Sequence, residues 1–381
     1  MGVCRMRIRP LAQAIACIRN IVSSRRGSLQ SIFRAALLLA ALLPPAVQSQ
    51  GQASCTDGDP DCRAARPQRH AVTTLAYWRE AFAKPVEQRI GVASPEVIDY
   101  LMQDNIKNKI PDRPRIPGLA PDFLRDVQQA FDELPAAVKR LLSAKLAGIM
   151  LAEDIGGTGY GEEIVDAGSN PVAVFVLLDS ALLSRQTANA WATLKENTPF
   201  KAQAGYELVA EIEARSDDNR KNAIQYILLH ELGHVLAVGE NIHPSTAIEP
   251  RNVQSTADLA YYSLSWTARK ENNRYATLFD ASFPQREDVI YYFGAKLAGE
   301  QMIDVYSALE ATNLPTLYAA NHPADDWAEA FVTYVHTVLM GKPFRIKLYQ
   351  DGKLAKEFKS CWSEKRCEQK REIIERFLSA R

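Results

Sequence analysis

Residues 222–238 read Asn222-Ala-Ile-Gln-Tyr-Ile-Leu-Leu-His230-Glu231-Leu-Gly-His234-Val-Leu-Ala-Val238. The stretch is apolar on nearly every turn of a helix and carries two histidines four residues apart. Side chains at i and i+4 lie one above the other on a helix, so both imidazoles can reach one metal ion. Glu231 is rotated by about 100° from that line, close enough to contact a water molecule at the metal but poorly placed as a ligand. This is the H-E-x-x-H pattern.

A pair of histidines on a helix is more often a pair of surface or core residues than a metal site. The chain has only 6 histidines in 381 residues, so this spacing arises rarely by chance. Ionisable side chains in so apolar a helix also need a partner such as a metal ion. The sequence therefore predicts a metal site at His230 and His234, with Zn²⁺ as the expected ion.

The composition is that of an ordinary globular protein, with 47% apolar and 24% charged residues. A chain of this length holds two or three domains, or one enzyme domain with appendages. The formal net charge is zero, which gives no support to nucleic-acid binding or to attraction by an anionic membrane.

The first fifty residues have the pattern of a secretory signal. Seven arginines and no acidic residue precede residue 35, and an apolar run follows at 35–43. That run is too short to span a bilayer, and small or polar residues after it suit a cleavage site. We therefore expect a signal peptide at 1–50, a flexible leader at 51–69, a secreted or periplasmic protein, and no membrane span once the signal is removed.

Cysteine usage agrees with export. Outside the presumed signal the chain has two close pairs, Cys55 with Cys62 and Cys361 with Cys367. The spacing suggests two local disulfides in an oxidising compartment. Pairing between the two ends of the chain, or a second metal site built from all four thiolates, stays open.

The expected fold class is α+β and mostly helical, with a small sheet beside the helix of the two histidines. Residues 171–179 are the clearest strand, either an edge strand that could bind an extended peptide or a buried central one. The glycine-rich segment 156–161 lacks the lysine of a phosphate-binding loop and is interpreted as a turn. Further helices are expected at 73–83, 95–107, 121–133, 135–151, 187–196, 287–310 and 368–378, and a hairpin at 344–358.

These elements divide the chain after the leader into three regions. We expect a helical N-terminal region at 70–150, a catalytic domain at 151–343, and a hairpin with a cysteine-containing helix at 344–381.

A catalytic zinc ion takes three protein ligands and keeps one position for water, so a third ligand must come from elsewhere. The best candidate segment is Asn321-His322-Pro-Ala-Asp325-Asp326-Trp327-Ala-Glu329-Ala-Phe-Val-Thr333-Tyr-Val-His336. It begins with a break at Asn-His-Pro and continues as a helix. Asp326, Glu329, Thr333 and His336 share one face of that helix.

The two segments together resemble the gluzincin clan of zinc metallopeptidases, in particular the group with D-x-A-E-x-F on the second helix that includes lethal-factor-like peptidases. The resemblance covers about a tenth of the chain. It implies a zincin-like domain with Glu329 as the third ligand. Asp326 is the alternative, as a ligand or as an acceptor for a histidine N–H. Thr333 stands where the thermolysin type has an aspartate.

The metzincin pattern fits less well. Its third histidine follows a glycine in H-E-x-x-H-x-x-G-x-x-H, and those two positions hold Ala237 and Glu240 here. Without the glycine the helix cannot easily bend to deliver a third ligand. His243 lies nearby but off that spacing.

The expected activity is hydrolysis of peptide bonds in a peptide or protein substrate, with Glu231 as the general base. The resemblance also implies a donor to the oxyanion near the third-ligand helix; His322 is preferred and Tyr318 is the alternative. Two other functions stay open: a metal-binding cell-envelope protein without proteolytic activity, and a zinc hydrolase of a non-peptide amide. A binding-only site has no need of a base at Glu231. The sequence leaves the oligomeric state open.

Overall fold

The computed structural model describes residues 70–246, 248–292 and 294–379 of the 381. The expected signal peptide, the leader and the Cys55–Cys62 pair lie outside the described residues. The described part is a mixture of helix and strand, with 44% helix against 19% strand. The expectation of a mixed, mainly helical fold is thus confirmed. In the described ranges, no helix is long and apolar enough to cross a bilayer.

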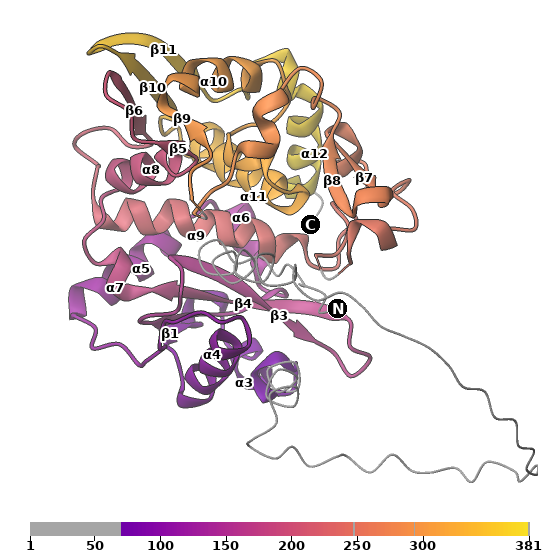
Figure 1. Ribbon diagram of the computed structural model, residues 1–381. Coiled ribbons are helices and arrows are strands. Elements are labelled where there is room, and N and C mark those ends of the chain that lie inside the picture. Colours follow the sequence, from indigo (N-terminus) through magenta and orange to yellow (C-terminus); the bar gives the residue numbers. More distant parts are fainter. Residues whose placement is uncertain (1–69, 247, 293, 380–381) are drawn as a thin grey trace, which may run out of the picture.

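A four-stranded sheet forms the lower part of the molecule in Figure 1. Its strands run in the order β1 (Ile90–Val92), β2 (Leu146–Ala152), β4 (Pro171–Asp179) and β3 (Gly159–Val165). The first three are parallel, and β3 is antiparallel to β4. Of the two alternatives for 171–179, the structure shows the buried central strand. The edge strand on this side is β3, and its last residue, Val165, forms an isolated bridge with Thr74.

Strand β4 separates two hydrophobic cores. Val174, Val176 and Leu178 point to the larger core, and Phe175 and Leu177 point to a smaller one on the opposite face. Successive side chains of a strand alternate between the two faces of the sheet, so this apolar strand contributes to a core on each face. Helix α4 (Pro95–Lys107) closes the smaller core with Val97, Tyr100 and Leu101.

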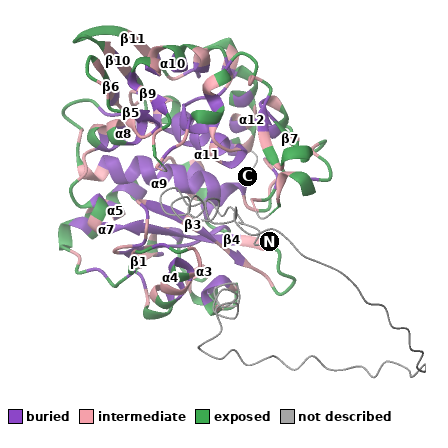
Figure 2. Ribbon diagram, viewed as in Figure 1, coloured by how far each residue is buried: buried purple, intermediate pink, exposed green. Residues whose placement is uncertain are grey.

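Helix α9 (Arg220–Ala237) covers the other face and is buried along almost its whole length (Figure 2). The side chain of Asn219 caps its N-terminus by accepting a hydrogen bond from the Asn222 amide. At its C-terminus, Lys145 Nζ donates to the carbonyls of Leu236 and Val238. A lysine at this end also complements the helix dipole.

Helix α11 (Pro323–Tyr334) crosses α9 at a point where neither helix has a large side chain. A Cβ added to Gly233 would lie 2.9 Å from the Cα of Ala328, closer than real carbon contacts allow. At the same point, the indole N–H of Trp327, the residue before Ala328, donates to the Gly233 carbonyl over 2.9 Å. The two helix backbones are therefore in direct contact at Gly233 and Ala328.

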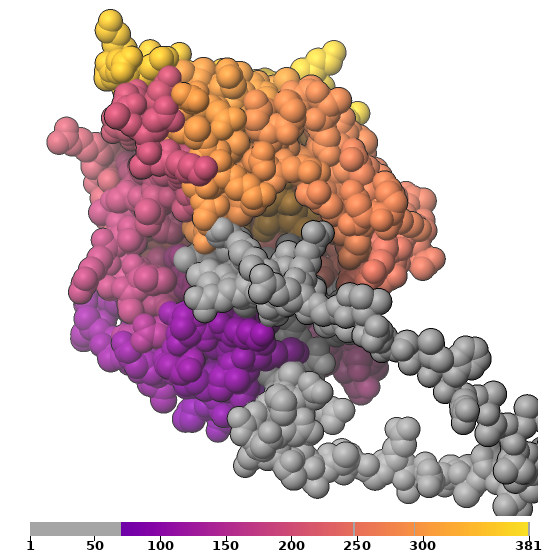
Figure 3. All heavy atoms as spheres, viewed as in Figure 1, coloured from indigo at the N-terminus to yellow at the C-terminus, as the bar shows by residue number. Residues whose placement is uncertain are grey.

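The upper part of the molecule holds the remaining strands (Figure 1). In the space-filling view, the indigo N-terminal residues form the lower part and the orange residues the upper part (Figure 3). A second sheet has the order β11 (Lys353–Lys359), β10 (Arg345–Gln350) and β6 (Tyr206–Glu211), all antiparallel. Two small pairs complete the strands of the described ranges. They are β5 (Phe200–Lys201) with β9 (Leu297–Ala298), and β7 (Trp266–Arg269) with β8 (Arg274–Thr277).

Helix α8 (Ala188–Asn197) closes the outer edge of β6 with side chains instead of a strand. Asn189, Thr193 and Asn197 stand one turn apart and bond to the backbone of β6 and the two residues after it. Asn189 Oδ1 accepts from two amides, Thr193 Oγ1 accepts from the Ala210 amide, and Asn197 donates to the Leu208 carbonyl. The polar ladder satisfies an edge that would otherwise be open.

Most predicted elements are confirmed. Three of the helices are α4, α5 (Pro121–Asp132) and α8, and the hairpin is β10–β11. Asp351 and Gly352 both have positive φ, as the tight turn requires. After the hairpin, Cys361 and Cys367 form the expected disulfide, and α12 (Glu368–Ser379) follows.

Four predictions are wrong in part. The helix expected at 135–151 ends at Leu142, and the rest is strand β2. Among the described residues of 287–310, the only α-helix is α10 (Met302–Glu310). At 73–83 the only α-helix is the short α3 (Arg79–Phe82). The glycine-rich turn passes into β3 at Gly159.

The boundary expected between 150 and 151 falls inside β2, so 70–150 contributes to the central sheet.

His336 follows α11 and is buried in its neutral form. Its Nε2 donates to the Ile212 carbonyl over 2.7 Å, and its ring stands edge-on to Tyr226. Burial lowers the pKa of His336 to about 4, although the bond to Ile212 opposes the shift. An unfolded histidine titrates near 6.5, so the unfolded chain binds more protons between these two values.

We therefore expect His336 to stabilise the fold above pH 6.5 and to lose this contribution as the pH falls. Between pH 7 and pH 5 the loss is about 2 kcal/mol. Glutamine at this position can still donate to the carbonyl but does not titrate. Urea unfolding should thus show a pH dependence that is shallower by this amount in His336→Gln. Parallel curves for the two proteins would contradict the assignment.

Candidate metal centre

His230 and His234 point the same ring nitrogen at a common point. Their Nε2 atoms are 3.2 Å apart, and both residues are buried on α9. Asp325, in the first turn of α11, places Oδ1 3.7 Å from Nε2 of His234. One ligand atom from each of the three residues lies within 4.8 Å of the others, so this group could hold a metal ion.

The spacing suits a tetrahedral ion. Zinc binds imidazole nitrogen at about 2.0–2.1 Å, and two ligands of a regular tetrahedron are then about 3.3 Å apart. The separations of 3.2 Å and 3.7 Å lie close to that value, and the third separation, between Asp325 and His230, is longer but within 4.8 Å. Two histidines and one carboxylate also leave the fourth position of the tetrahedron open.

Glu329 lies on the other side of His230. Its Oε1 is 2.8 Å from Nδ1 of that ring, with an angle too bent for a regular hydrogen bond. The carboxylate also accepts from Lys195 and from Thr316, each over 2.7 Å. The predicted ligand is thus placed behind a histidine, away from the paired Nε2 atoms. Such a carboxylate orients a ligand.

The structure places Asp325, and not the predicted ligand Glu329, beside the two Nε2 atoms, and the difference is one of helix phase. Asp325 and Glu329 are one turn apart, as are His230 and His234, so two pairs of side chains meet where α9 and α11 cross. Asp325 faces the Nε2 atoms and Glu329 faces Nδ1. The matching i and i+4 spacing in both segments was the available signal, whereas the predicted face began one residue later, at Asp326.

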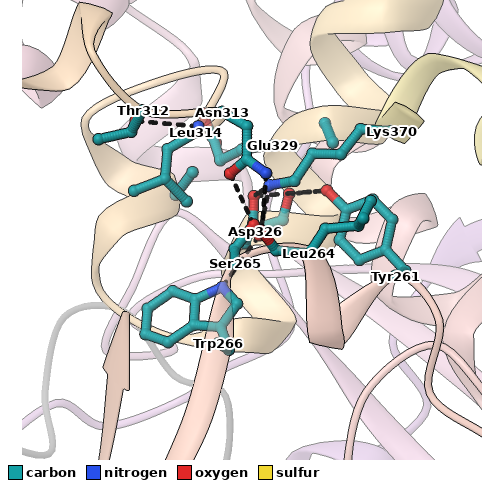
Figure 4. Close-up of polar contacts among 12 residues, drawn as sticks. Tyr261, Leu264, Ser265, Trp266, Thr312, Asn313, Leu314, Asp326, Glu329 and Lys370 are labelled. Atoms are coloured by element: carbon teal, nitrogen blue, oxygen red, sulfur yellow. Dashed lines mark hydrogen bonds and ion pairs between the residues drawn. The ribbon is translucent and has the colours of Figure 1, made fainter. Parts of the chain in front are cut away.

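Asp326 belongs to a separate buried cluster, shown in Figure 4. Both of its carboxylate oxygens lie 2.6 Å from Nζ of Lys370 in α12. Trp266 donates an indole N–H over 2.9 Å, and the hydroxyl of Tyr261 lies 3.3 Å from Oδ1. These bonds point Asp326 away from the histidines and fix α12 to α11.

The centre carries more buried carboxylate than compensating charge. Burial, together with the nearby Asp325, raises the pKa of Glu231 to about 8. Burial and the charge of Glu329 raise the pKa of Asp325 to about 8. Both shifts arise because two carboxyls are held close together out of water. A cation between them would favour the ionised form of each.

Glu329 is the exception and is fully ionised. Burial acts to raise its pKa, but the charge of Lys195 and the contact with His230 outweigh burial and hold the pKa at about 2. Lys195 comes from α8 and is itself buried. Its ammonium lies 3.9 Å from Glu196 and 4.6 Å from the ring centre of Tyr318. Nothing in the sequence patterns singled out Lys195.

Both predicted oxyanion donors, Tyr318 and His322, lie near the two histidines. The ring of Tyr318 is 5.6 Å from that of His230, and burial raises its pKa far above 10, so the hydroxyl stays protonated. His322 caps α11, with Nδ1 accepting from the Ala324 amide. Burial lowers the pKa of His322 to about 3, so this ring is neutral.

Comparisons of the chain with protein-family models, with curated proteins and with solved structures find no match. The case for a function therefore rests on the geometry and the charge of the centre itself.

The buried pair of Lys370 and Asp326 yields a stability prediction. Lys370→Met leaves the carboxylate buried without a counter-charge, which should cost about 3–5 kcal/mol of unfolding free energy, measured by urea denaturation. Adding Asp326→Asn should recover part of the loss because no unpaired charge is left. The control is Arg371→Ala in the exposed pair with Glu375 on the same helix, expected to cost at most about 1 kcal/mol. Equal losses for the two single variants would contradict the prediction.

Proposed function

We propose that the protein is a zinc-dependent hydrolase of peptide bonds. The observation that carries the proposal is the convergence of two imidazole nitrogens and one carboxylate oxygen within 4.8 Å of one another, with Glu231 beside them on the same helix. The spacing of His230-Glu231-x-x-His234, which resembles the gluzincin pattern, agrees with this proposal.

The residues present fit a divalent cation. The two histidines have depressed pKa values because of burial, so both rings are neutral ligands. Burial raises the pKa values of Glu231 and Asp325 to about 8, so both carboxyls are mostly protonated at neutral pH without a cation, and a bound cation would favour their ionised forms. In this proposal His230, His234 and Asp325 are the ligands, and Glu329 holds His230 in position.

In this proposal the residues around the centre have separate roles in the reaction. Bound zinc lowers the pKa of water toward neutrality and polarises a carbonyl oxygen. Glu231 accepts the proton of the attacking water and delivers it to the leaving amine. The hydroxyl of Tyr318 donates to the developing oxyanion. We prefer it to His322 because Tyr318 lines the same cavity as Glu231, while Nδ1 of His322 is engaged at the helix cap.

A peptide is the substrate that best suits the surroundings. Strand β3 is an edge strand, and the cavity beside the centre is lined by Thr158 and Gly159 at its start. An exposed strand edge binds an extended peptide by main-chain hydrogen bonds. A secreted or periplasmic location is part of the proposal, and the Cys361–Cys367 disulfide is compatible with it.

The ligand assignment predicts an order of zinc affinities. Asp325→Asn removes a ligand charge and should weaken zinc binding by more than about 100-fold. Glu329→Gln removes only the partner of His230 and should weaken it by about 10–100-fold. The measurement is competition with a fluorescent chelator. Each substitution replaces a carboxylate by an amide of the same shape, so a difference in zinc affinity between the two variants should not come from a difference in folding. A larger effect of Glu329→Gln would return the third ligand to Glu329.

The base assignment predicts that Glu231→Gln binds zinc as the wild type does but loses cleavage by about 10²–10⁴-fold in kcat. Zinc content and cleavage of casein or a peptide mixture are measured on the same preparations. Chelator-treated wild type, with activity restored by added zinc, is the control. Cleavage that persists in Glu231→Gln would refute the mechanism.

These measurements also separate the other two functions. A cell-envelope protein that only binds metal would take up zinc in both proteins and cleave no peptide. A hydrolase of a non-peptide amide would likewise leave peptides intact but would hydrolyse small amides, with the same dependence on Glu231.

A further inference from the structure

A small cavity opens beside the candidate centre, next to His230 and Glu231. Its walls are Trp191 of α8, Ile227 of α9 and the rings of Tyr292 and Tyr318. Ile227 lies three residues before His230, so it is on the same face of α9. The cavity is thus continuous with the groups that would carry out the reaction.

The cavity has a volume of about 30 Å³. A single water molecule needs about 10–15 Å³ on this measure, so the space takes roughly two waters, or a methyl or hydroxymethyl group. Trp191 adds a large, nearly buried ring to the wall, and this ring lies 5.9 Å from the ring of Tyr226 on α9. Leucine or phenylalanine side chains exceed this space.

The charges around the cavity disfavour charged side chains. Lys195 lines it, and its ammonium is bonded to Glu329 over 2.7 Å and lies 3.9 Å from Glu196. A basic side chain would meet this ammonium. An acidic one would meet those two carboxylates and Glu231, in surroundings with little water.

The position of Glu231 indicates which substrate residue enters. In the proposed mechanism Glu231 delivers a proton to the leaving nitrogen, so the residue that carries this nitrogen lies beside it. That residue follows the scissile bond, and the cavity is the space next to Glu231 that can take its side chain.

We propose that this cavity selects peptides with a small uncharged residue, glycine, alanine or serine, directly after the scissile bond, and that Trp191 sets the limit on size. The inference rests on the proposed peptide hydrolysis. It goes beyond it by naming a substrate class and the residue that determines it.

The first test uses the zinc-loaded wild type and a mixture of peptides, with cleavage sites read by mass spectrometry. Peptides that differ only in the residue after the scissile bond then give relative kcat/KM values. We expect alanine and serine to exceed phenylalanine, aspartate and lysine by at least about 30-fold, as size exclusion in a tight pocket allows.

The second test enlarges the cavity. Trp191→Ala should lower the ratio of kcat/KM for alanine over leucine by about 10-fold, and Trp191→Phe should lower it less. Leu194→Ala is the control, because Leu194 is on the same helix but 59% exposed and outside the cavity lining. It should leave the ratio unchanged.

A third measurement does not depend on turnover. The Glu231→Gln variant should bind the alanine peptide at least about fivefold more tightly than the phenylalanine peptide in calorimetry. Wild-type cleavage with leucine or phenylalanine preferred would overturn the cavity proposal and leave the hydrolase standing. Absence of peptide cleavage, with zinc bound, would overturn the hydrolase, and with it the claim that this cavity selects substrates for cleavage.

Discussion

The direct contact between the backbones of α9 and α11 at Gly233 and Ala328 is the constraint on which the centre depends. The side chains of His230, His234 and Asp325 converge where the two helices cross in close contact. Small residues at the crossing provide this approach, and the Trp327 bond to the Gly233 carbonyl fixes it. His230 and His234 of α9 then meet Asp325 and Glu329 of α11 directly.

Buried lysines hold the pieces of the structure around this crossing. Lys145 donates to a carbonyl at the C-terminus of α9, and Lys195 binds Glu329 behind His230. Lys370 of α12 binds Asp326 of α11 and so joins these two helices. Each comes from an element distant in sequence from the group it contacts. Buried pairs of this kind contribute little net stability but are costly to break. They therefore specify which segments pack together more than they strengthen the fold.

Local patterns predicted local structure well. Helix α9, strand β4 and the hairpin turn at Asp351 and Gly352 follow from hydrophobic periodicity and turn chemistry. The same rules failed at 146–152, where an apolar run fits a helix or a buried strand equally well. Lys195 and Asp325 were missed because their roles depend on which face of one helix meets another, and a single sequence contains no direct record of that pairing. His230, Glu231 and His234 were accessible because their spacing lies within one helix.

The polar ladder of α8 on β6 has a consequence for association between molecules. A sheet recruits further strands at whichever edge leaves its amides and carbonyls free. Asn189, Thr193 and Asn197 occupy the β6 edge, so the three-stranded sheet can be extended only at β11. There an antiparallel self-pairing centred on Lys356 would set Lys353 against Lys359 and so bring like charges together. The same helix that supplies a wall of the cavity thus also protects the molecule against edge-to-edge aggregation.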